Sequence, residues 1–188
     1  MPARTSLTDP LRIDEVRAFP APGVIGITFC PGKRDAHAMS GAWERDLAMD
    51  LEAIRRWGAR TLVTLIEDHE FGLLGVEALP AQAVSAGLEW IHLPIRDVSV
   101  PDGRFVEGWK TAGPRLSALL GSGGRLVVHC RGGLGRAGMV ASLLLIEQGV
   151  APADAVRRVR AARPGAIETK GQERWVGTYV SPQAQSRR

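Results

Sequence analysis

Hydrophobic residues gather in four short and nearly continuous runs along the chain. The runs are residues 24–29 (VIGITF), 61–66 (TLVTLI), 89–95 (EWIHLPI) and 125–130 (RLVVHC). Runs of this length, rich in β-branched residues, are typical of strands in a sheet that is buried on both faces. We therefore predict four β-strands at these positions.

Between and after these runs, apolar residues recur at the three- and four-residue spacing of helices. The predicted helices cover residues 43–57, about 79–86, 105–120, 136–148, 152–162 and 172–179. The segment 136–148 is apolar almost all round, so we expect a central buried helix there. Pro114 is expected to kink or divide the helix over 105–120, because proline removes a backbone hydrogen bond.

Strands that alternate with helices are typical of an α/β fold. We predict one three-layer α/β domain over residues 21–180, with a central, largely parallel sheet of four to five strands flanked by helices. Residues 1–20 form an extended polar lead-in and residues 181–188 a flexible tail. Ligands of such sheets bind at the carboxyl ends of the strands.

Composition and charge narrow the class of protein. The chain has 188 residues, of which 45% are hydrophobic, and a net charge of +4, which excludes global disorder and favours anionic ligands without requiring nucleic acid. Two cysteines are too few for a disulfide framework. No apolar run reaches the roughly 18 residues of a membrane span, and the N-terminus has no signal-peptide core. We expect a cytoplasmic monomer that binds neither membranes nor nucleic acid.

The candidate chemistry lies where the fourth predicted strand ends in His129 and Cys130. The glycine-rich segment 131–136 (RGGLGR) follows and leads into the buried helix. Successive N–H groups of such a loop can form an anion-binding nest, to which the helix N-terminus adds positive charge. Arg136, six positions after Cys130, can grip two oxygens of the same anion. These surroundings favour a thiolate beneath a bound phosphate, an arrangement suited to phosphoryl transfer.

The stretch HCRGGLGRAG (residues 129–138) resembles the Cys-x5-Arg signature of cysteine-dependent protein tyrosine phosphatases. It looks most like the kinase-associated (cyclin-dependent kinase inhibitor-associated) branch of the dual-specificity group. Residues 94–97 (PIRD) with 101–102 (PD) are similar to that branch's acid loop, and residues 165–172 (GAIETKGQ) to its downstream glutamine segment. The resemblance spans about residues 24–179. It implies a tyrosine phosphatase-like fold and hydrolysis of phosphoproteins or small phosphomonoesters through a phosphocysteine.

The resemblance also implies a role for each matching residue. Cys130 is the expected nucleophile, Arg136 holds the phosphoryl group, and Asp97 is the general acid and then the base. His129 organises the loop and supports the thiolate, while Gln172 positions the attacking water. No metal or other cofactor is implied, because Arg136 and the loop N–H groups supply the positive field. The expected phosphate-binding residues are Arg131, Gly132, Gly133, Leu134, Gly135 and Arg136.

Some alternatives stay open. Such phosphatases usually have Ser or Thr directly after the signature arginine, where this chain has Ala137, so a phosphate-binding pseudophosphatase or adaptor is a second hypothesis. Sulfur transfer by a rhodanese-like loop is a third. Asp102 has the chemistry of a turn or cap residue, and residues 67–70 (EDHE) are interpreted as a solvated acidic loop. The sequence leaves open the natural substrate and the preference between phosphotyrosine and phosphoserine/threonine.

Overall fold

The structure, a computed structural model, describes residues 3–38 and 41–181. The predicted flexible tail over 181–188 lies outside these residues, apart from Ser181. The Ser181 side chain is buried and donates a hydrogen bond to Glu147 Oε2 at 2.7 Å. No helix in the described ranges is both long and apolar enough to cross a membrane.

The central sheet has five strands in the order β1-β2-β7-β5-β6. The four predicted strands are confirmed and pair in parallel. Their bounds are β2 (Val24–Thr28), β5 (Thr61–Thr64), β6 (Glu89–His92) and β7 (Arg125–His129). The fifth strand, β1 (Asp14–Arg17), pairs antiparallel with β2 at the edge of the sheet.

The predicted lead-in over residues 1–20 contains β1, which joins the edge of the central sheet. The sequence of β1, DEVR, alternates buried and exposed positions over only four residues, with Asp14 among the buried ones. A buried carboxylate in a short run conceals the apolar alternation from which strands are recognised. That carboxylate pairs with Arg12 Nε at 2.6 Å and with Arg163 Nη1, 149 positions away, at 2.6 Å.

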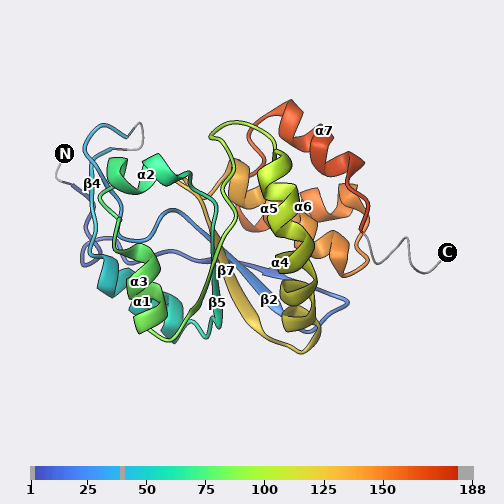
Figure 1. Ribbon diagram of the computed structural model, residues 1–188, viewed down its shortest axis with the longest axis horizontal. Helices are drawn as coiled ribbons and strands as arrows, with labels where there is room; N and C mark the ends of the chain where they lie inside the picture. Colours follow the sequence, from blue (N-terminus) through green and yellow to red (C-terminus); the bar gives the residue numbers. More distant parts are fainter. Residues whose placement is uncertain (1–2, 39–40, 182–188) are drawn as a thin grey trace.

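Helices cover both faces of the sheet, and the predicted three-layer α/β fold is confirmed (Figure 1). On one face lie α1 (Leu47–Arg56), α2 (Asp68–Leu73) and α3 (Leu79–Ser85). On the other face lie α4 (Gly103–Gly121), α5 (Gly135–Glu147), α6 (Pro152–Ala162) and α7 (Lys170–Thr178). Two further short strands, β3 (Arg34–Asp35) and β4 (Trp43–Glu44), pair with each other outside the main sheet.

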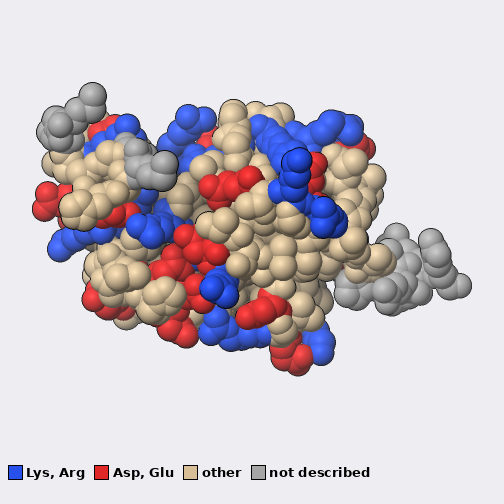
Figure 2. Space-filling view, turned by 90° about the horizontal axis from the view of Figure 1, so that it is seen from above, with Lys and Arg blue, Asp and Glu red and all other residues tan. Residues whose placement is uncertain are grey.

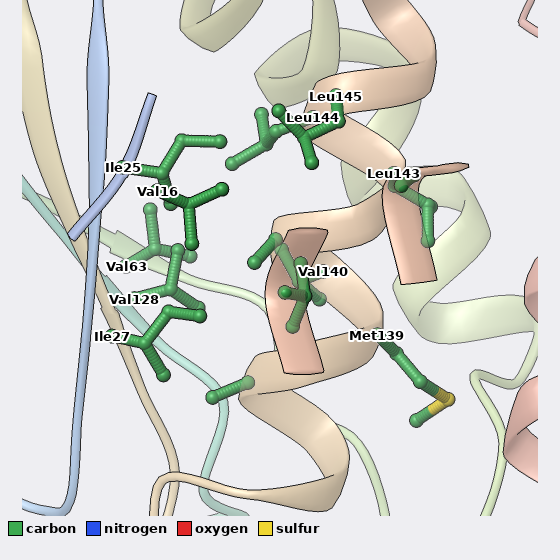
Figure 3. Close-up of a cluster of buried hydrophobic side chains, with 14 of the residues drawn as sticks. Val16, Ile25, Ile27, Val63, Val128, Met139, Val140, Leu143, Leu144 and Leu145 are labelled. Atoms are coloured by element: carbon green, nitrogen blue, oxygen red, sulfur yellow. The ribbon is translucent and has the colours of Figure 1, made fainter. Parts of the chain in front are cut away.

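Alternation along the strands divides the hydrophobic core in two. Val63 and Val128 face the helices α4–α7, whereas Leu62 and Val127 face α1 and α3. Figure 3 shows the first of these clusters, with strand side chains such as Ile25 and Val128 opposite those of α5. Every residue of α5 is buried, as its apolar sequence predicts. The helix that follows the candidate loop is therefore fixed in the centre of the larger core.

Two helix predictions and one loop prediction differ from the structure. The helix predicted over 43–57 begins only at Leu47, because Asp46 caps it and Trp43 belongs to β4. Helix α4 runs through Pro114 undivided. Pro114 is exposed, and buried residues on both sides of it, among them Trp109 and Leu116, hold the helix against the sheet.

The third correction concerns residues 67–70. These residues do not form a solvated loop but the start of α2. Glu67 and Glu70 make a capping box, in which the Glu70 side chain accepts a hydrogen bond from the Glu67 N–H at 2.8 Å. Glu70 is only 3% exposed. A buried carboxylate requires a hydrogen-bonding or charged partner. The partner of Glu70 is Arg136, at the carboxyl ends of the strands.

Candidate active site

The loop after β7 turns sharply enough to bring a backbone N–H back to the cysteine. Cys130 is 3% exposed, and Gly133 N–H donates to its Sγ at 3.2 Å. Gly133 has a φ of +70°, and a Cβ at this position would lie 2.4 Å from the Thr28 carbonyl oxygen. Glycine is therefore required here both by backbone conformation and by the close approach of β2.

Arg163, at the end of α6, orients this loop from outside. Its Nε donates to the Gly133 carbonyl at 2.9 Å and its Nη2 to the Gly132 carbonyl at 3.0 Å. Its Nη1 pairs with Asp14 of β1 at 2.6 Å. The carbonyl and N–H of a trans peptide point in opposite directions, so carbonyls held by Arg163 direct the N–H groups of Gly133 and Leu134 toward the cysteine side.

Arg136 lies in the first turn of α5 and is 1% exposed. Its two terminal nitrogens form a fork with Glu70, at 2.5 Å from Nη1 to Oε2 and 3.0 Å from Nη2 to Oε1. Nη1 also donates to the Ile95 carbonyl at 3.1 Å. The Nε of Arg136 is buried and has no hydrogen-bond partner among the described residues. The fork fixes the guanidinium plane, and the contacts to Glu70 and Ile95 leave two of the five N–H groups, that of Nε and one on Nη2, for other acceptors.

The Arg136–Glu70 pair keeps both groups charged. Burial alone would raise the pKa of the Glu70 carboxyl, but hydrogen bonds from Arg136 and the Glu67 N–H outweigh it and hold that pKa below its ordinary value. Burial likewise acts to lower the pKa of Arg136, and the Glu70 hydrogen bonds and nearby negative charges reverse this effect. A positive charge therefore persists beneath the loop at any pH at which the fold is intact.

Asp97 and Asp102 have different surroundings. Asp97 Oδ1 lies 2.9 Å from Arg136 Nη2, and its side chain is 47% exposed. Asp102 is the N-cap of α4 and accepts hydrogen bonds from Arg104 N–H and Phe105 N–H, as its turn chemistry predicts. Val98, next to Asp97, has a φ of +56°, an unusual conformation for a β-branched residue. Only Asp97 of these two aspartates contacts the arginine beneath the loop.

His129 is fully buried, and this burial is the main reason why its pKa falls to about 3. Its Nδ1 lies 3.4 Å from the Cys130 carbonyl oxygen, and its Nε2 lies 2.8 Å from Thr64 Oγ1. The imidazole is thus neutral at physiological pH. The ring contacts the first peptide of the loop at the carbonyl group of Cys130.

Gln172 has both ends of its amide engaged. Its Oε1 accepts from the Thr169 N–H at 3.3 Å within a capping box, and its Nε2 donates to the Ser99 carbonyl at 3.3 Å. These contacts tie α7 to the segment that carries Asp97. From the same region, Glu168 contacts the loop directly, because its Oε2 accepts the Gly135 N–H at 2.8 Å.

Two of the expected phosphate-binding residues have carboxylate partners in this structure: the Arg131 side chain pairs with Asp35 at 2.8 Å, and Gly135 N–H donates to Glu168. Glu70, Arg163 and Glu168 were not predicted as site residues from the sequence. The Glu67-x-x-Glu70 spacing of a capping box was a usable signal for the helix at Glu70. Nothing local marks Arg163, whose role depends on contacts with residues 30 to 149 positions away.

Cys30 is the second cysteine, and both cysteines are free thiols. Cys30 is fully buried, and this burial raises the pKa of its thiol far above the ordinary value. It behaves as a packed neutral thiol. In the described part of the chain, no group of three or more His, Cys, Asp or Glu side chains is arranged to hold a metal.

Comparison with known proteins places the chain among phosphatases. Residues 38–176 match the family model described as Swiss Army Knife protein, DSP-PTPase phosphatase domain. Protein tyrosine phosphatase type IVA 3 from Homo sapiens is 31% identical over 124 residues, which cover 66% of each chain. Cyclin-dependent kinase inhibitor 3 from Mus musculus is 28% identical over 137 residues, or 72% of this chain and 64% of that protein. The chain thus matches slightly less than two thirds of these relatives' length.

Among solved structures, a kinase-associated phosphatase with its catalytic-site cysteine replaced by serine superposes with a TM-score of 0.78. The match covers 89% of this chain and 93% of that one at 23% sequence identity. A structure of PTPMT1 in complex with PI(5)P matches with a TM-score of 0.61 at 18% identity. At these identities the likeness concerns the fold.

Replacing Glu70 by glutamine tests the buried ion pair. Glu70→Gln removes one charge-assisted hydrogen bond to Arg136, so we expect the free energy of unfolding at pH 7 to fall by about 1.5–3 kcal/mol. Because the pKa of Glu70 is lowered in the folded state, its stabilisation is present above the ordinary value of 4.5 and is lost as the pH falls through the folded-state value. Urea unfolding at several pH values should show the two proteins converging in acid. Exposed Glu77 offers the control Glu77→Gln, and equal losses in both variants would contradict the assignment.

Replacing Arg163 by lysine tests the outside support of the loop. A lysine ammonium cannot hold two neighbouring carbonyls and Asp14 in one plane. We expect Arg163→Lys to weaken the binding of orthovanadate by about tenfold, the effect of roughly one lost hydrogen bond to a charged group. Isothermal titration measures this affinity. Arg157→Lys, on the exposed side of the same helix, should leave it unchanged; vanadate binding unaltered in Arg163→Lys would show that the loop keeps its shape unaided.

Proposed function

Since the chain belongs to the DSP-PTPase phosphatase domain family of Swiss Army Knife proteins, we propose that it hydrolyses phosphomonoesters of phosphotyrosine or phosphoserine/threonine proteins through a phosphocysteine. The observation that carries the proposal is the meeting of three groups at one loop. These are the Cys130 sulfur under a loop N–H, the unpartnered Nε of Arg136, and the Asp97 carboxylate beside that arginine.

In the first step, the Cys130 thiolate attacks phosphorus and forms an S–P bond while the P–O bond to the alcohol or phenol breaks. The loop N–H groups and Arg136 stabilise the charge on the equatorial oxygens. Asp97 gives its proton to the leaving oxygen. In the second step, a water molecule attacks phosphorus, Asp97 takes the water's proton, and the S–P bond breaks to release phosphate and regenerate the thiolate.

Asp97 must change partners between these states. Without a bound phosphate, its carboxylate pairs with Arg136 Nη2 at 2.9 Å. A phosphate dianion gripped by Arg136 competes with this carboxylate for the guanidinium and displaces it. The released Asp97 side chain can then turn toward the leaving oxygen. The exposure of Asp97 and its place in a loop outside the core leave room for this exchange.

Protein substrates are supported by the names of the relatives, which include protein tyrosine phosphatases and a kinase-associated phosphatase. Small phosphomonoesters share the same reacting group and remain within the proposal. We further propose that the protein is a cytoplasmic monomer whose partners are these substrates. Its two unpaired cysteines suit a reducing compartment.

Ala137 favours a second candidate function, a pseudophosphatase that binds phosphate but turns over negligibly. Ala137 is fully buried in the first turn of α5, and its methyl side chain cannot donate a hydrogen bond. Within the described ranges, the hydrogen bond to Cys130 Sγ comes from Gly133 N–H. Return of negative charge to sulfur in the second step therefore depends on the backbone and on the helix N-terminus.

Hydrolysis of a chromogenic aryl phosphate decides between the two functions. We expect measurable turnover in the wild type and none in Cys130→Ser, because the serine hydroxyl is far less ionised than the thiol. Vanadate binding should persist in that variant, since the loop N–H groups are unchanged. Cys30→Ser is the matched control and should retain activity. Binding without turnover in the wild type would support the pseudophosphatase, and wild-type rates in Cys130→Ser would contradict the covalent mechanism.

Leaving-group dependence tests the acid. Asp97→Asn should slow hydrolysis most for alkyl phosphates, whose leaving alkoxides need a proton, and least for aryl phosphates with acidic phenols. The slope of log kcat/KM against the leaving-group pKa should become steeper. Asp102→Asn, which alters only a helix cap, should leave that slope unchanged. The reverse pattern would assign the acid to Asp102.

A further inference from the structure

Three side chains on neighbouring strands form a line that ends at the first peptide of the phosphate loop. Trp90 of β6 lies with its Nε1 2.9 Å from Thr64 Oγ1 of β5, and Thr64 Oγ1 lies 2.8 Å from His129 Nε2 of β7. Thr64 and His129 are fully buried. The Trp90 indole is held by stacking on His92 and by an edge contact with Phe71. The Thr64 and His129 members of the line are therefore shielded from water, while Trp90 is half-buried.

The direction of each hydrogen bond in this line follows from what its members can donate. An indole N–H can only donate, so Thr64 Oγ1 accepts from Trp90. The Thr64 hydroxyl then has one hydrogen left, and donating it to His129 Nε2 satisfies both groups. The opposite arrangement, with Nε2–H donating to Thr64, would leave the buried hydroxyl hydrogen without an acceptor in this line.

His129 consequently carries its single proton on Nδ1. Burial keeps the ring neutral, and the charges that face it come from Arg136 of α5, Glu70 of α2 and His92 of β6. The Nδ1–H then donates to the Cys130 carbonyl oxygen, 3.4 Å away. In the other tautomer, the Nδ1 lone pair would face that oxygen and repel it.

The Cys130 carbonyl matters because its peptide also carries the Arg131 N–H. The two groups of a trans peptide point in opposite directions, so a carbonyl held toward His129 directs the Arg131 N–H away from it. A peptide freed from His129 can rotate and misalign the first donor of the anion nest.

We propose that Thr64 and Trp90 are positioning residues that hold His129 in its Nδ1–H tautomer and so fix the first peptide of the phosphate loop. The catalytic consequence rests on the proposed phosphatase function. The tautomer itself does not, because it follows from the hydrogen-bond line alone.

Nitrogen-15 NMR of the imidazole rings at pH 7 tests the tautomer independently of activity. We expect His129 in the wild type to carry its proton on Nδ1 and to show a bare Nε2. Thr64→Val should populate the Nε2–H form, whereas Thr64→Ser should retain the wild-type spectrum. Trp90→Phe should give a mixture, because the threonine hydroxyl is then free to accept from Nε2–H. A wild-type ring protonated on Nε2, or a Thr64→Val spectrum identical to wild type, would overturn the proposal.

Two functional measurements test whether the loop changes when His129 loses its Thr64 partner. We expect Thr64→Val to lower kcat/KM for an aryl phosphate about three- to tenfold, the range of one neutral hydrogen bond. The pH profile for alkylation of Cys130 by iodoacetamide should also shift in Thr64→Val. Thr64→Ser should restore both the wild-type kcat/KM and the wild-type alkylation profile. If the wild type has no turnover, the proposed function fails, while alkylation and NMR still decide this inference.

Two variants elsewhere in the chain serve as matched controls. Thr61→Val removes a buried hydroxyl from the other end of β5, where it bonds Glu89, and Trp57→Phe removes an indole N–H that bonds Glu15. Both controls should leave the His129 spectrum and the alkylation profile as in the wild type. Equal effects in Thr61→Val and Thr64→Val would show a general loss of stability and contradict a positioning role.

Discussion

The peptide planes between Cys130 and Gly135 can present their N–H groups to one anion only if their carbonyl groups turn outward, and each outward carbonyl needs a donor. The structure supplies one for every carbonyl from Cys130 to Leu134. Their donors, in chain order, are His129 Nδ1, Cys30 N–H, Arg163 Nη2, Arg163 Nε and Gly138 N–H. These donors come from β7, the end of β2, α6 and α5. The shape of the loop is thus a property of the assembled sheet and helices, and not of the glycines alone.

Charge in the site is arranged around the buried Arg136. Glu70 neutralises it from below through a two-pronged contact, and Asp97 meets it from a loop that is half-exposed. A third carboxylate, that of Glu168, lies on the Gly135 N–H at the start of α5. Figure 2 shows basic and acidic residues interspersed on the face seen from above. The Arg136–Glu70 pair is buried, whereas the carboxylates of Asp97 and Glu168 occupy donors that the proposed phosphate would need.

Sequence could predict what is encoded locally. The four parallel strands, the buried helix after the loop and the roles suggested for Cys130 and Arg136 all depend on residues adjacent in the chain. Helix α2 was missed because its acidic capping box resembles a solvated loop until Arg136, 66 positions later, is placed beside Glu70. Strand β1 was missed because Asp14 interrupts its apolar pattern, and this aspartate pairs both with neighbouring Arg12 and with Arg163, 149 positions away. Residue pairs this far apart in the chain produce no repeating pattern in the sequence from which a helix or strand could be predicted.

Strand β1, at the edge of the sheet, limits where a shorter fragment of this domain can begin. The segment matched by the family model begins at residue 38, whereas β1 and β2 both precede it. A fragment excised at that boundary would expose the whole pairing edge of β7, an open template for association with other chains. It would also lose Asp14, the partner that aims Arg163 at the loop carbonyls. The smallest autonomous unit therefore starts before β1, and libraries or crystallisation fragments of related chains should be bounded by sheet topology rather than by the extent of sequence similarity.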